Sequence, residues 1–197
     1  MDYEILSWVS KTFGSSKFFA VLSSILSFIG DKYFVIGFVV LLLCFKKTRK
    51  VGFYVMIAGG IAVFINNCLI KNIVKRDRPF ISHPELANMC ELAGIDLPDE
   101  YSMASGHSVT SMAVAIAIIF FSKKWGIVAI IVSVLIGLSR IGLCVHYPTD
   151  VLVGWVLGAV IAIGLHFLTN YGVKLFNSKR GNKNEKNSIS NEKSEQN

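Results

Sequence analysis

The residues best suited to chemistry are a histidine and an aspartate four positions apart, His146 and Asp150, which follow Ser139-Arg140. Pro148 suits the first turn of a helix, which would place the Asp150 carboxylate one turn from the His146 ring. A carboxylate there can hold the proton of one ring nitrogen and direct the other nitrogen at an electrophile. The pair therefore predicts a histidine nucleophile or base, while a structural pair of the same spacing stays an equal alternative.

A second histidine stands in the motif Ala104-Ser105-Gly106-His107, at the start of an apolar segment. In a helix, the first backbone N–H groups lack intrahelical partners and form an anion site with the positive end of the dipole. Gly106 would let a phosphate approach closely, and His107 could protonate a leaving oxygen because imidazole titrates near neutral pH. Alone, the motif fits Ser105 as a simple N-cap and His107 as an interfacial residue.

Basic residues gather before Pro79, at Lys71, Lys75, Arg76 and Arg78. The i, i+4, i+7 spacing of Lys71, Lys75 and Arg78 predicts one helical face, and the helix should end at Arg78 because proline disfavours helical backbone before it. Arginine offers a planar fork to phosphate oxygens, and lysine adds a compact charge. Lys71 and Arg78 are therefore predicted phosphate ligands. Lys75 and Arg76 are either head-group contacts or a basic collar at the membrane surface.

The elements that must position these groups are membrane helices. Of 197 residues, 53% are hydrophobic and 17% are charged, and the mean hydropathy is +0.55. Soluble domains carry about a quarter charged residues, and this length fits one domain. The net charge of +7 falls between apolar runs and forms no continuous stripe, which favours a membrane protein over one that binds nucleic acid.

We expect an all-α polytopic membrane bundle of about six transmembrane helices, at residues 18–30, 33–45, 51–70, 109–121, 125–138 and 151–168. The first two are short for a bilayer and could instead form one helix broken at residues 30–32. Residues 1–15 predict an interfacial N-terminal helix, and residues 16–176 form the membrane domain. The polar residues 177–197 predict a disordered cytoplasmic tail.

Positive charge predicts the orientation of these helices in a cell membrane. Clusters of lysine and arginine at residues 46–50, at 123–124 and after residue 173 fall on one side, which the positive-inside rule assigns to the cytoplasm. The motifs with His107 and His146 then face the outside, together with the basic cluster that begins at Lys71. That cluster lies where the rule disfavours positive charge, so it indicates an anionic ligand.

Two pairs of small residues leave alternatives open. Gly154 and Gly158 are spaced for close helix approach, more often within a chain than in a dimer. Cys90 and Cys144 would share the outer face and either pair or stay as free thiols. No feature predicts the oligomeric state.

Together and in this order, the three motifs resemble the type 2 phosphatidic acid phosphatase family of lipid phosphatases. The family pattern is a lysine, six residues and Arg-Pro; then Pro-Ser-Gly-His; then Ser-Arg, five residues, a histidine, three residues and an aspartate. This chain matches from Lys71 to Asp150, within a resemblance that covers most of residues 51–168. Ala104 replaces the family's proline, which should loosen the start of the following helix without removing a ligand.

The resemblance implies a two-step reaction on a lipid phosphate that needs no metal and no other cofactor. His146 would attack phosphorus to give a phosphohistidine, and Asp150 would fix its tautomer. His107 would protonate the departing oxygen and later take a proton from water. Oxygens of the phosphate would be held by fixed donors, namely the side chains of Lys71, Arg78 and Arg140 and the N–H groups of Ser105 and Gly106.

The resemblance leaves the lipid open. Bacterial members act on undecaprenyl pyrophosphate, phosphatidylglycerol phosphate, phosphatidate or lipid A. We expect undecaprenyl pyrophosphate, with Lys75 and Arg76 as candidate contacts of its second phosphate. The alternatives are phosphoryl transfer to another lipid, lipid binding without catalysis, and a small channel or transporter. The two histidines argue against binding alone, and the His–Asp spacing argues against a channel.

Overall fold

The computed structural model describes residues 1–195, with side chains for all except Leu175 and residues 178–195. The chain divides into two units, residues 1–163 and residues 164–197. The described residues form helices and loops but no strand, which confirms the all-α expectation. In chain order the elements are α1 (Asp2–Phe13), α2 (Lys17–Ile29), α3 (Lys32–Cys44), α4 (Arg49–Phe64), the π-helical turn η1 (Ile65–Ile70), α5 (Lys71–Val74), α6 (Pro79–Ser82), the 3₁₀ turn η2 (Pro84–Ala87), α7 (Asn88–Ala93), α8 (Gly106–Ile119), α9 (Lys123–Gly142) and α10 (Pro148–Glu195).

The described helices confirm a polytopic membrane bundle, with fewer full-length spans than the six expected. Three segments are long and apolar enough to cross a membrane alone: Arg49–Ser82, Lys123–Gly142 and Pro148–Lys174. α2 and α3 qualify only as a pair that is bent by 43°. α8 is apolar but has 14 residues, whereas a span needs about 20.

The bend between α2 and α3 has a local cause. Gly30 ends α2, and the Asp31 carboxylate caps α3 by accepting a hydrogen bond of 2.8 Å from Tyr33 N. The two short segments of the sequence thus meet at residues 30–32. This favours one broken span over two separate ones.

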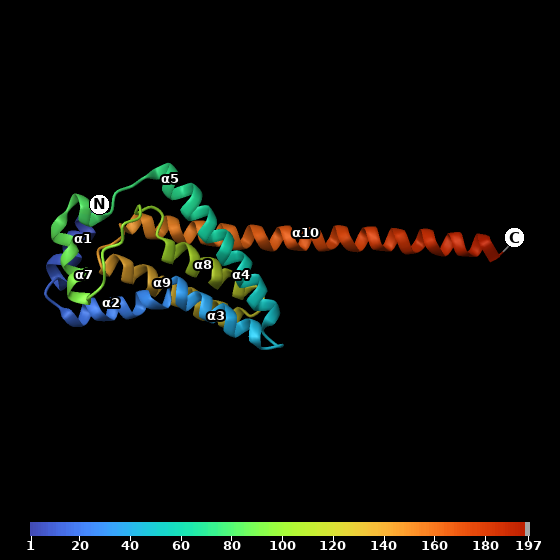
Figure 1. The fold of residues 1–197 in the computed structure, drawn as a ribbon, viewed down its shortest axis with the longest axis horizontal. Coiled ribbons are helices and arrows are strands. Elements are labelled where there is room, and N and C mark those ends of the chain that lie inside the picture. Colours follow the sequence, from blue (N-terminus) through green and yellow to red (C-terminus); the bar gives the residue numbers. More distant parts are fainter. Residues whose placement is uncertain (196–197) are drawn as a thin grey trace. The chain divides into compact units, whose positions relative to one another are not determined.

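α8 lies inside the bundle, where it packs against α4 and α9 (Figure 1). Glycines on α10 also let that helix approach α8 closely. A Cβ atom added at Gly158 would lie 2.3 Å from Val109 O, and one at Gly154 would lie 2.8 Å from Ser108 Cβ. The glycine pair therefore serves packing within the chain.

An apolar cluster fixes α1 on the end of the bundle that carries the site loops. Leu6 and Val9 of α1 pack with Leu86 and Met89 of the segment before α8, and also with Ala20, Cys144 and Tyr147. Figure 1 shows α1 and α7 together at this end. The expected N-terminal helix is thus present, and it covers the loop that follows α9.

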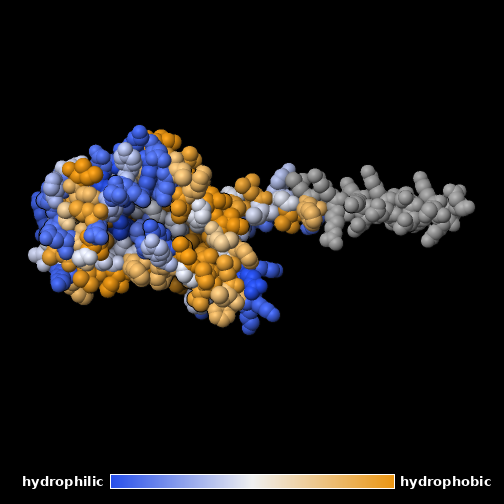
Figure 2. Space-filling view, in the orientation of Figure 1, coloured by the Kyte–Doolittle hydropathy of each residue, from blue (hydrophilic) through white to orange (hydrophobic). Residues whose placement is uncertain are grey.

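The surface separates polar ends from an apolar middle. Figure 2 shows hydrophilic residues gathered at the end near α1 and α5 and at the turn between α3 and α4, with hydrophobic surface between them. The turn carries Lys46, Lys47, Arg49 and Lys50. This distribution is typical of a protein that spans a membrane, with the basic turn between α3 and α4 on one side of it.

Cys90 and Cys144 are buried free thiols. Cys90 Sγ donates a hydrogen bond of 3.5 Å to Leu143 O. Of the two alternatives for these cysteines, the structure therefore favours free thiols.

The second unit, residues 164–197, comprises the C-terminal part of α10 together with residues 196–197. The backbone of residues 177–195 is helical, although the composition predicts disorder there. Side chains from Ser178 on and residues 196–197 lie outside the described part of the chain. The disordered tail stays a prediction.

Replacing Gly158 by alanine should destabilise the bundle. The new methyl group would lie 2.3 Å from Val109 O, so α8 and α10 would have to separate, at a cost of about 1–3 kcal/mol, as for other overpacked cores. Thermal unfolding of the protein in detergent measures this loss.

Gly164→Ala, on the same helix, is the matched control, because a Cβ atom there meets no atom within 4 Å. Both changes gain the same helix propensity, so the difference between the two melting temperatures isolates the clash. Equal melting temperatures would contradict the close approach of α8 and α10.

Candidate active site

The basic cluster does not lie on one helical face. α4 continues through η1 into α5, but the helix stops where Lys75 adopts a left-handed conformation, with φ 48° and ψ 40°. Arg78 lies beyond the helix and is extended, with φ −75° and ψ 155°, as expected before Pro79. The prediction that Lys71, Lys75 and Arg78 share a helical face is therefore wrong. Lys71 and Arg78 instead reach the site from two different backbone segments.

One cavity of about 790 Å³ lies where the motifs meet. Its lining includes six of the predicted site residues: Lys71, Arg78, Gly106, His107, Arg140 and His146. The other four, Asp150, Ser105, Lys75 and Arg76, do not line it. The structure thus brings both histidines together with three cations.

The ring of His146 is oriented by Arg78. His146 is 2% exposed, and its Nε2 lies 3.3 Å from Arg78 Nη1. A guanidinium can only donate hydrogen bonds, so Nε2 carries the lone pair and Nδ1 carries the proton. Arg78 is itself held by two carbonyl oxygens, because its Nε donates to Glu100 O at 2.6 Å and its Nη1 to Val145 O at 3.0 Å. The lone pair of His146 therefore faces the cations of the cavity, as a nucleophile that attacks an anion requires.

Asp150 supports His146 through an intermediate hydroxyl. Asp150 Oδ2 accepts hydrogen bonds from Ser102 Oγ at 2.5 Å and from Tyr147 N at 2.9 Å. The distance from Oδ2 to His146 Nδ1 is 3.7 Å, which exceeds a hydrogen bond, whereas Ser102 Oγ lies 3.4 Å from Nδ1. The predicted direct hydrogen bond between Asp150 and the ring is thus replaced by Ser102, which no motif indicated.

The start of α8 offers fewer free donors than the sequence predicts. Ser105 N donates to Asp150 O at 3.1 Å, so this N–H is engaged, contrary to the prediction, and ties α8 to α10. The Ser105 hydroxyl is buried without a hydrogen-bond partner among the described residues. Gly106 and His107 begin the helix and line the cavity. Their N–H groups lack intrahelical partners and stay suited to an anion.

Arg140 has an unused donor beside the cavity. Its Nη1 donates to Ser27 Oγ of α2 at 2.5 Å, while its Nε is buried with no hydrogen-bond partner among the described residues. Within residues 1–195, as far as their side chains are described, neither Arg140 nor Arg78 forms an ion pair. Buried charges without a counterion are costly unless a ligand supplies one. Two uncompensated guanidinium groups therefore indicate a site for an anion of double charge.

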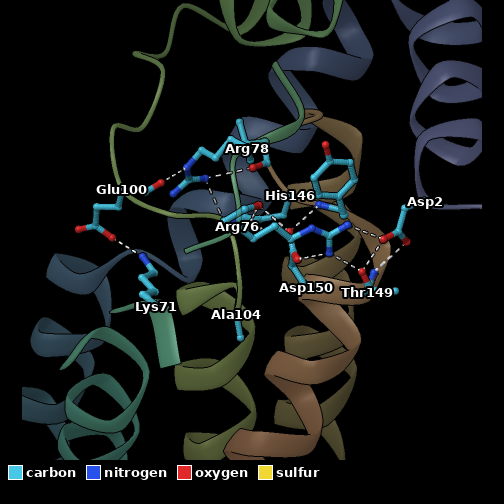
Figure 3. Close-up of polar contacts among 12 residues, drawn as sticks. Asp2, Lys71, Arg76, Arg78, Glu100, Ala104, His146, Thr149 and Asp150 are labelled. Carbon is cyan, nitrogen blue, oxygen red and sulfur yellow. Dashed lines mark hydrogen bonds and ion pairs between the residues drawn. The ribbon is translucent and has the colours of Figure 1, made fainter. Parts of the chain in front are cut away.

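Lys71 is paired with a carboxylate that the sequence analysis did not single out. Lys71 Nζ forms an ion pair and hydrogen bond with Glu100 Oε2 (Figure 3). Both residues line the cavity, and the Glu100 side chain is 61% exposed. The hydrogen bond from Lys71 holds the pKa of Glu100 below its usual range, against the opposing effect of partial burial. Glu100 therefore stays ionised at neutral pH and covers a cation that a phosphate would need.

The two remaining predicted residues lie apart from the cavity. Lys75 is exposed, at the left-handed position that ends α5. Arg76 donates to the carboxylates of Asp2 and Asp150 (Figure 3). Among the described residues, no group of three or more histidine, cysteine, aspartate or glutamate side chains could hold a metal ion.

A family model, that of the PAP2 superfamily, matches residues 47–174, which include every motif described above. The chain belongs to the PAP2 superfamily. This membership confirms the resemblance seen in the sequence.

Curated PAP2-type relatives support the enzyme class. The undecaprenyl-diphosphatase of Sulfolobus acidocaldarius is 35% identical over 147 residues, which cover 73% of this chain and 68% of that protein. Undecaprenyl-diphosphatase BcrC of Bacillus subtilis is 32% identical over 168 residues, which cover 82% and 80%. Together with the PAP2 match, they confirm the expected enzyme class, a lipid phosphatase.

Solved PAP2 structures share the fold. A transmembrane PAP2-type phosphatidylglycerolphosphate phosphatase from Bacillus subtilis has a TM-score of 0.68 at 23% identity, over 86% of this chain and 85% of that one. LpxE from Aquifex aeolicus has a TM-score of 0.65 at 20% identity, over 82% and 92%.

Sequence reasoning missed several residues that complete this PAP2 site. Ser102, Glu100, Ser27 and Asp2 all contact predicted site residues. Ser102 lies three positions before Ser105, and this closeness to a motif was the one available signal. The other three lie in segments without a motif, and only the folded chain brings them to the site.

The change Glu100→Gln should lower the KM for a lipid phosphate and leave kcat unchanged. The substrate would no longer have to displace a charged carboxylate from Lys71. A partly exposed ion pair contributes at most about 1 kcal/mol, so the expected decrease is about two- to fivefold. Because the pKa of Glu100 is lowered, the difference from wild type should persist between about pH 5 and pH 8. Steady-state kinetics at several pH values measures it.

Glu91→Gln is the matched control, because it removes the same charge from the exposed surface of α7, outside the cavity. An equal KM for wild type and Glu100→Gln, or an equal decrease in both variants, would contradict the proposed competition between Glu100 and phosphate.

Proposed function

We propose that this protein hydrolyses a phosphate group from a lipid, most simply undecaprenyl pyrophosphate, through a phosphohistidine intermediate on His146. The observation that carries the proposal is the cavity itself. The Nε2 lone pair of His146 faces Arg78 at 3.3 Å, in a cavity shared with Lys71, Arg140 and His107. Such a cavity joins a nucleophile to fixed charges that stabilise an anionic transition state.

In the first step, His146 Nε2 attacks phosphorus, and the bond between phosphorus and the leaving oxygen breaks. His107 gives its proton to that oxygen, so the oxygen does not leave with the negative charge that the bond cleavage would otherwise place on it. The Nδ1 proton of His146 remains directed at Ser102 and Asp150, which stabilise the positive ring. Arg78 and Arg140 bind the oxygens that gain charge.

In the second step, His107 takes a proton from water, and the water oxygen attacks the phosphohistidine. The bond between phosphorus and Nε2 breaks, inorganic phosphate leaves, and the lone pair returns to Nε2. Both steps use the same cations, so no group has to move between them. The charges that a metal ion would supply in other phosphoryl-transfer enzymes are supplied here by side chains.

The shape and lining of the cavity support a lipid substrate. Beyond the catalytic groups the cavity continues along α3 and α4, where its lining is apolar and includes Val35, Val39, Val40, Val55 and Val63. A chain attached to the phosphate could lie along this wall. The names of the two curated relatives favour undecaprenyl pyrophosphate over phosphatidylglycerol phosphate or phosphatidate. Lys75 stays a candidate contact of the second phosphate.

We also propose that the site faces the outside of a cell membrane and that the C-terminal tail is cytoplasmic. The basic turn between α3 and α4 and the pair Lys123-Lys124 support this orientation. An enzyme in this orientation would act on lipids of the outer leaflet.

The change His146→Ala should abolish phosphate release, because it removes the Nε2 lone pair that faces Arg78 and would take the phosphoryl group. His107→Ala should keep a residual rate, about a hundredfold or more below wild type, since it loses general acid–base catalysis alone. The assay measures phosphate released in detergent and excess EDTA from undecaprenyl pyrophosphate, phosphatidylglycerol phosphate and phosphatidate.

Wild-type release from one of these lipids, lost in His146→Ala, supports hydrolysis and identifies the substrate. Release that stops in EDTA and returns with magnesium would contradict a site of fixed charges alone. A folded wild type that transfers phosphate to a second lipid, with none released to water, would replace hydrolysis by phosphotransfer.

Gly60→Leu should narrow the apolar part of the cavity and lower kcat/KM for a long-chain substrate. Gly60 lines the cavity, and a Cβ atom there meets no atom within 4 Å, so the change is compatible with the fold. Displacing about two methylene groups of the lipid at about 0.8 kcal/mol each predicts about a tenfold loss. A short-chain phosphate ester should react at an unchanged rate.

Gly37→Leu is the matched control. Gly37 is an exposed residue of α3 with nothing within 4 Å of its Cβ position, and it does not line the cavity. Equal losses for long and short substrates, or equal losses in both variants, would place the lipid chain elsewhere.

A further inference from the structure

Arg76 contacts the aspartate of the catalytic pair, although it does not line the cavity. The left-handed Lys75 ends α5 and turns the chain, and Ser102 N donates to Arg76 O at 2.8 Å. Arg76 Nη1 then donates to Asp150 Oδ1 at 2.7 Å. The other carboxylate oxygen, Oδ2, is the one that accepts hydrogen bonds from Ser102 and the backbone. Arg76 therefore holds the oxygen of Asp150 that faces away from the ring of His146.

The guanidinium of Arg76 also contacts residues that directly follow His146. Its Cζ lies 3.9 Å from the centre of the Tyr147 ring, and its Nη1 also donates to Thr149 Oγ1 at 2.7 Å. With the bond to Asp150, three residues within four positions of His146 contact this one side chain. Arginine suits such a position because its planar fork stacks on an aromatic ring while it donates in its own plane.

Asp2 of α1 completes the arrangement from outside (Figure 3). Arg76 Nη2 donates to Asp2 Oδ2 at 2.8 Å, and the Thr149 hydroxyl donates to the same carboxylate. Thr149 N, in the first turn of α10, donates to Asp2 Oδ1 at 3.3 Å. One carboxylate therefore fixes both Arg76 and the start of the helix that carries Asp150.

We propose that Arg76, anchored by Asp2, is a positioning residue that holds the Asp150 carboxylate in place behind His146 during phosphoryl transfer; this rests on the proposed function. Asp150 is fully buried, and Arg76 is the arginine that pairs with it. Without Arg76 the carboxylate would lose its fixed partner and could rotate away from Ser102. A head-group contact, the role predicted from sequence, would instead require the Arg76 guanidinium to leave the two carboxylates that it binds.

The charges of the linked residues Asp2, Arg76 and Asp150 also affect the protonation of His146. Removing the cation Arg76 should make a protonated His146 ring easier to form, whereas removing the anion Asp2 should make it harder. Other groups that face the ring are Arg78, Arg140 and His107, and they stay unchanged in all variants. If Arg76 and Asp2 had a purely structural role, removing either charge would shift the titration midpoint of the His146 ring in the same direction.

The first test compares Arg76→Gln and Arg76→Lys with wild type in the full chain, on the lipid that wild type hydrolyses. We expect kcat to fall between about tenfold and a hundredfold, the effect of misplacing a reacting group by about an ångström. KM should change by less than about twofold, because Arg76 does not touch the substrate. Arg76→Lys should not restore kcat, since an ammonium has no planar fork to bridge two carboxylates.

The second test is the pH dependence of kcat. Arg76→Gln should move the acid limb to higher pH by about half a unit, and Asp2→Asn should move it to lower pH. The ¹⁵N signals of the His146 ring in detergent should show midpoints that move in the same two directions. This measurement needs no substrate, so it tests the positioning role even if the protein releases no phosphate from any lipid.

Two controls separate these effects from a general change of charge. Glu4→Gln is matched to Asp2→Asn, because Glu4 lies in the same first turn of α1 and its side chain is 79% exposed. Lys11→Gln removes an exposed cation from the same helix. Neither should alter kcat or the ring titration.

A raised KM with unchanged kcat in Arg76→Gln would overturn the proposal in favour of a substrate contact. Shifts of the His146 midpoint in one direction for both Arg76→Gln and Asp2→Asn, or no shift, would also overturn it. If thermal unfolding shows that Arg76→Gln is not folded, the test rests on Asp2→Asn, because this variant keeps the ion pair between Arg76 and Asp150. Failure of the proposed function would appear separately, as a wild type that releases no phosphate.

Discussion

The compensation of buried charge is the constraint on which this structure depends. Burying an ion costs several kcal/mol unless opposite charge or hydrogen bonds replace its water. Asp150 has Arg76 as its partner, and Lys71 has Glu100. Among the described residues, Arg78 and Arg140 have carbonyl or hydroxyl partners but no carboxylate. The site therefore holds a fixed excess of positive charge, which a phosphate dianion would neutralise.

Helices without catalytic motifs hold these charges in place. Ser27 of α2 accepts the hydrogen bond of Arg140. At the end of the same helix, a Cβ atom added to Gly30 would lie 2.6 Å from Ile136 Cγ2 of α9 and 3.0 Å from His107 Cδ2. Only a residue without a side chain fits this contact. The break between α2 and α3 thus lies against the site, so the bend of the span and the position of His107 depend on one another.

Site residues that lie close together in the sequence could be predicted from their spacing, whereas those that tertiary contacts bring to the site were missed. His146 and Asp150 lie within one turn, at the start of a helix set by proline, and the motifs with both histidines reached one cavity as expected. The end of α5 at Lys75 was missed, because the composition of residues 75–78 is compatible with a helix. The chain leaves the helix there because its backbone bonds to a neighbouring loop, as when Ser102 N donates to Arg76 O. Ser102 and Glu100 were missed for a related reason. They belong to an irregular segment whose position depends on distant partners.

The irregular segments explain why the cations lie where they do. Irregular backbone that is buried in a protein needs partners for its polar groups. Here Arg78 donates to two loop carbonyls, Ser102 N donates to Arg76 O, and Ser105 N donates to Asp150 O. These contacts join three loops and also fix the side chains of the site. The same hydrogen bonds therefore position the reacting groups and satisfy the polar backbone groups of the loops. A change that leaves a loop carbonyl without its hydrogen bond should also displace the cation that donates to it.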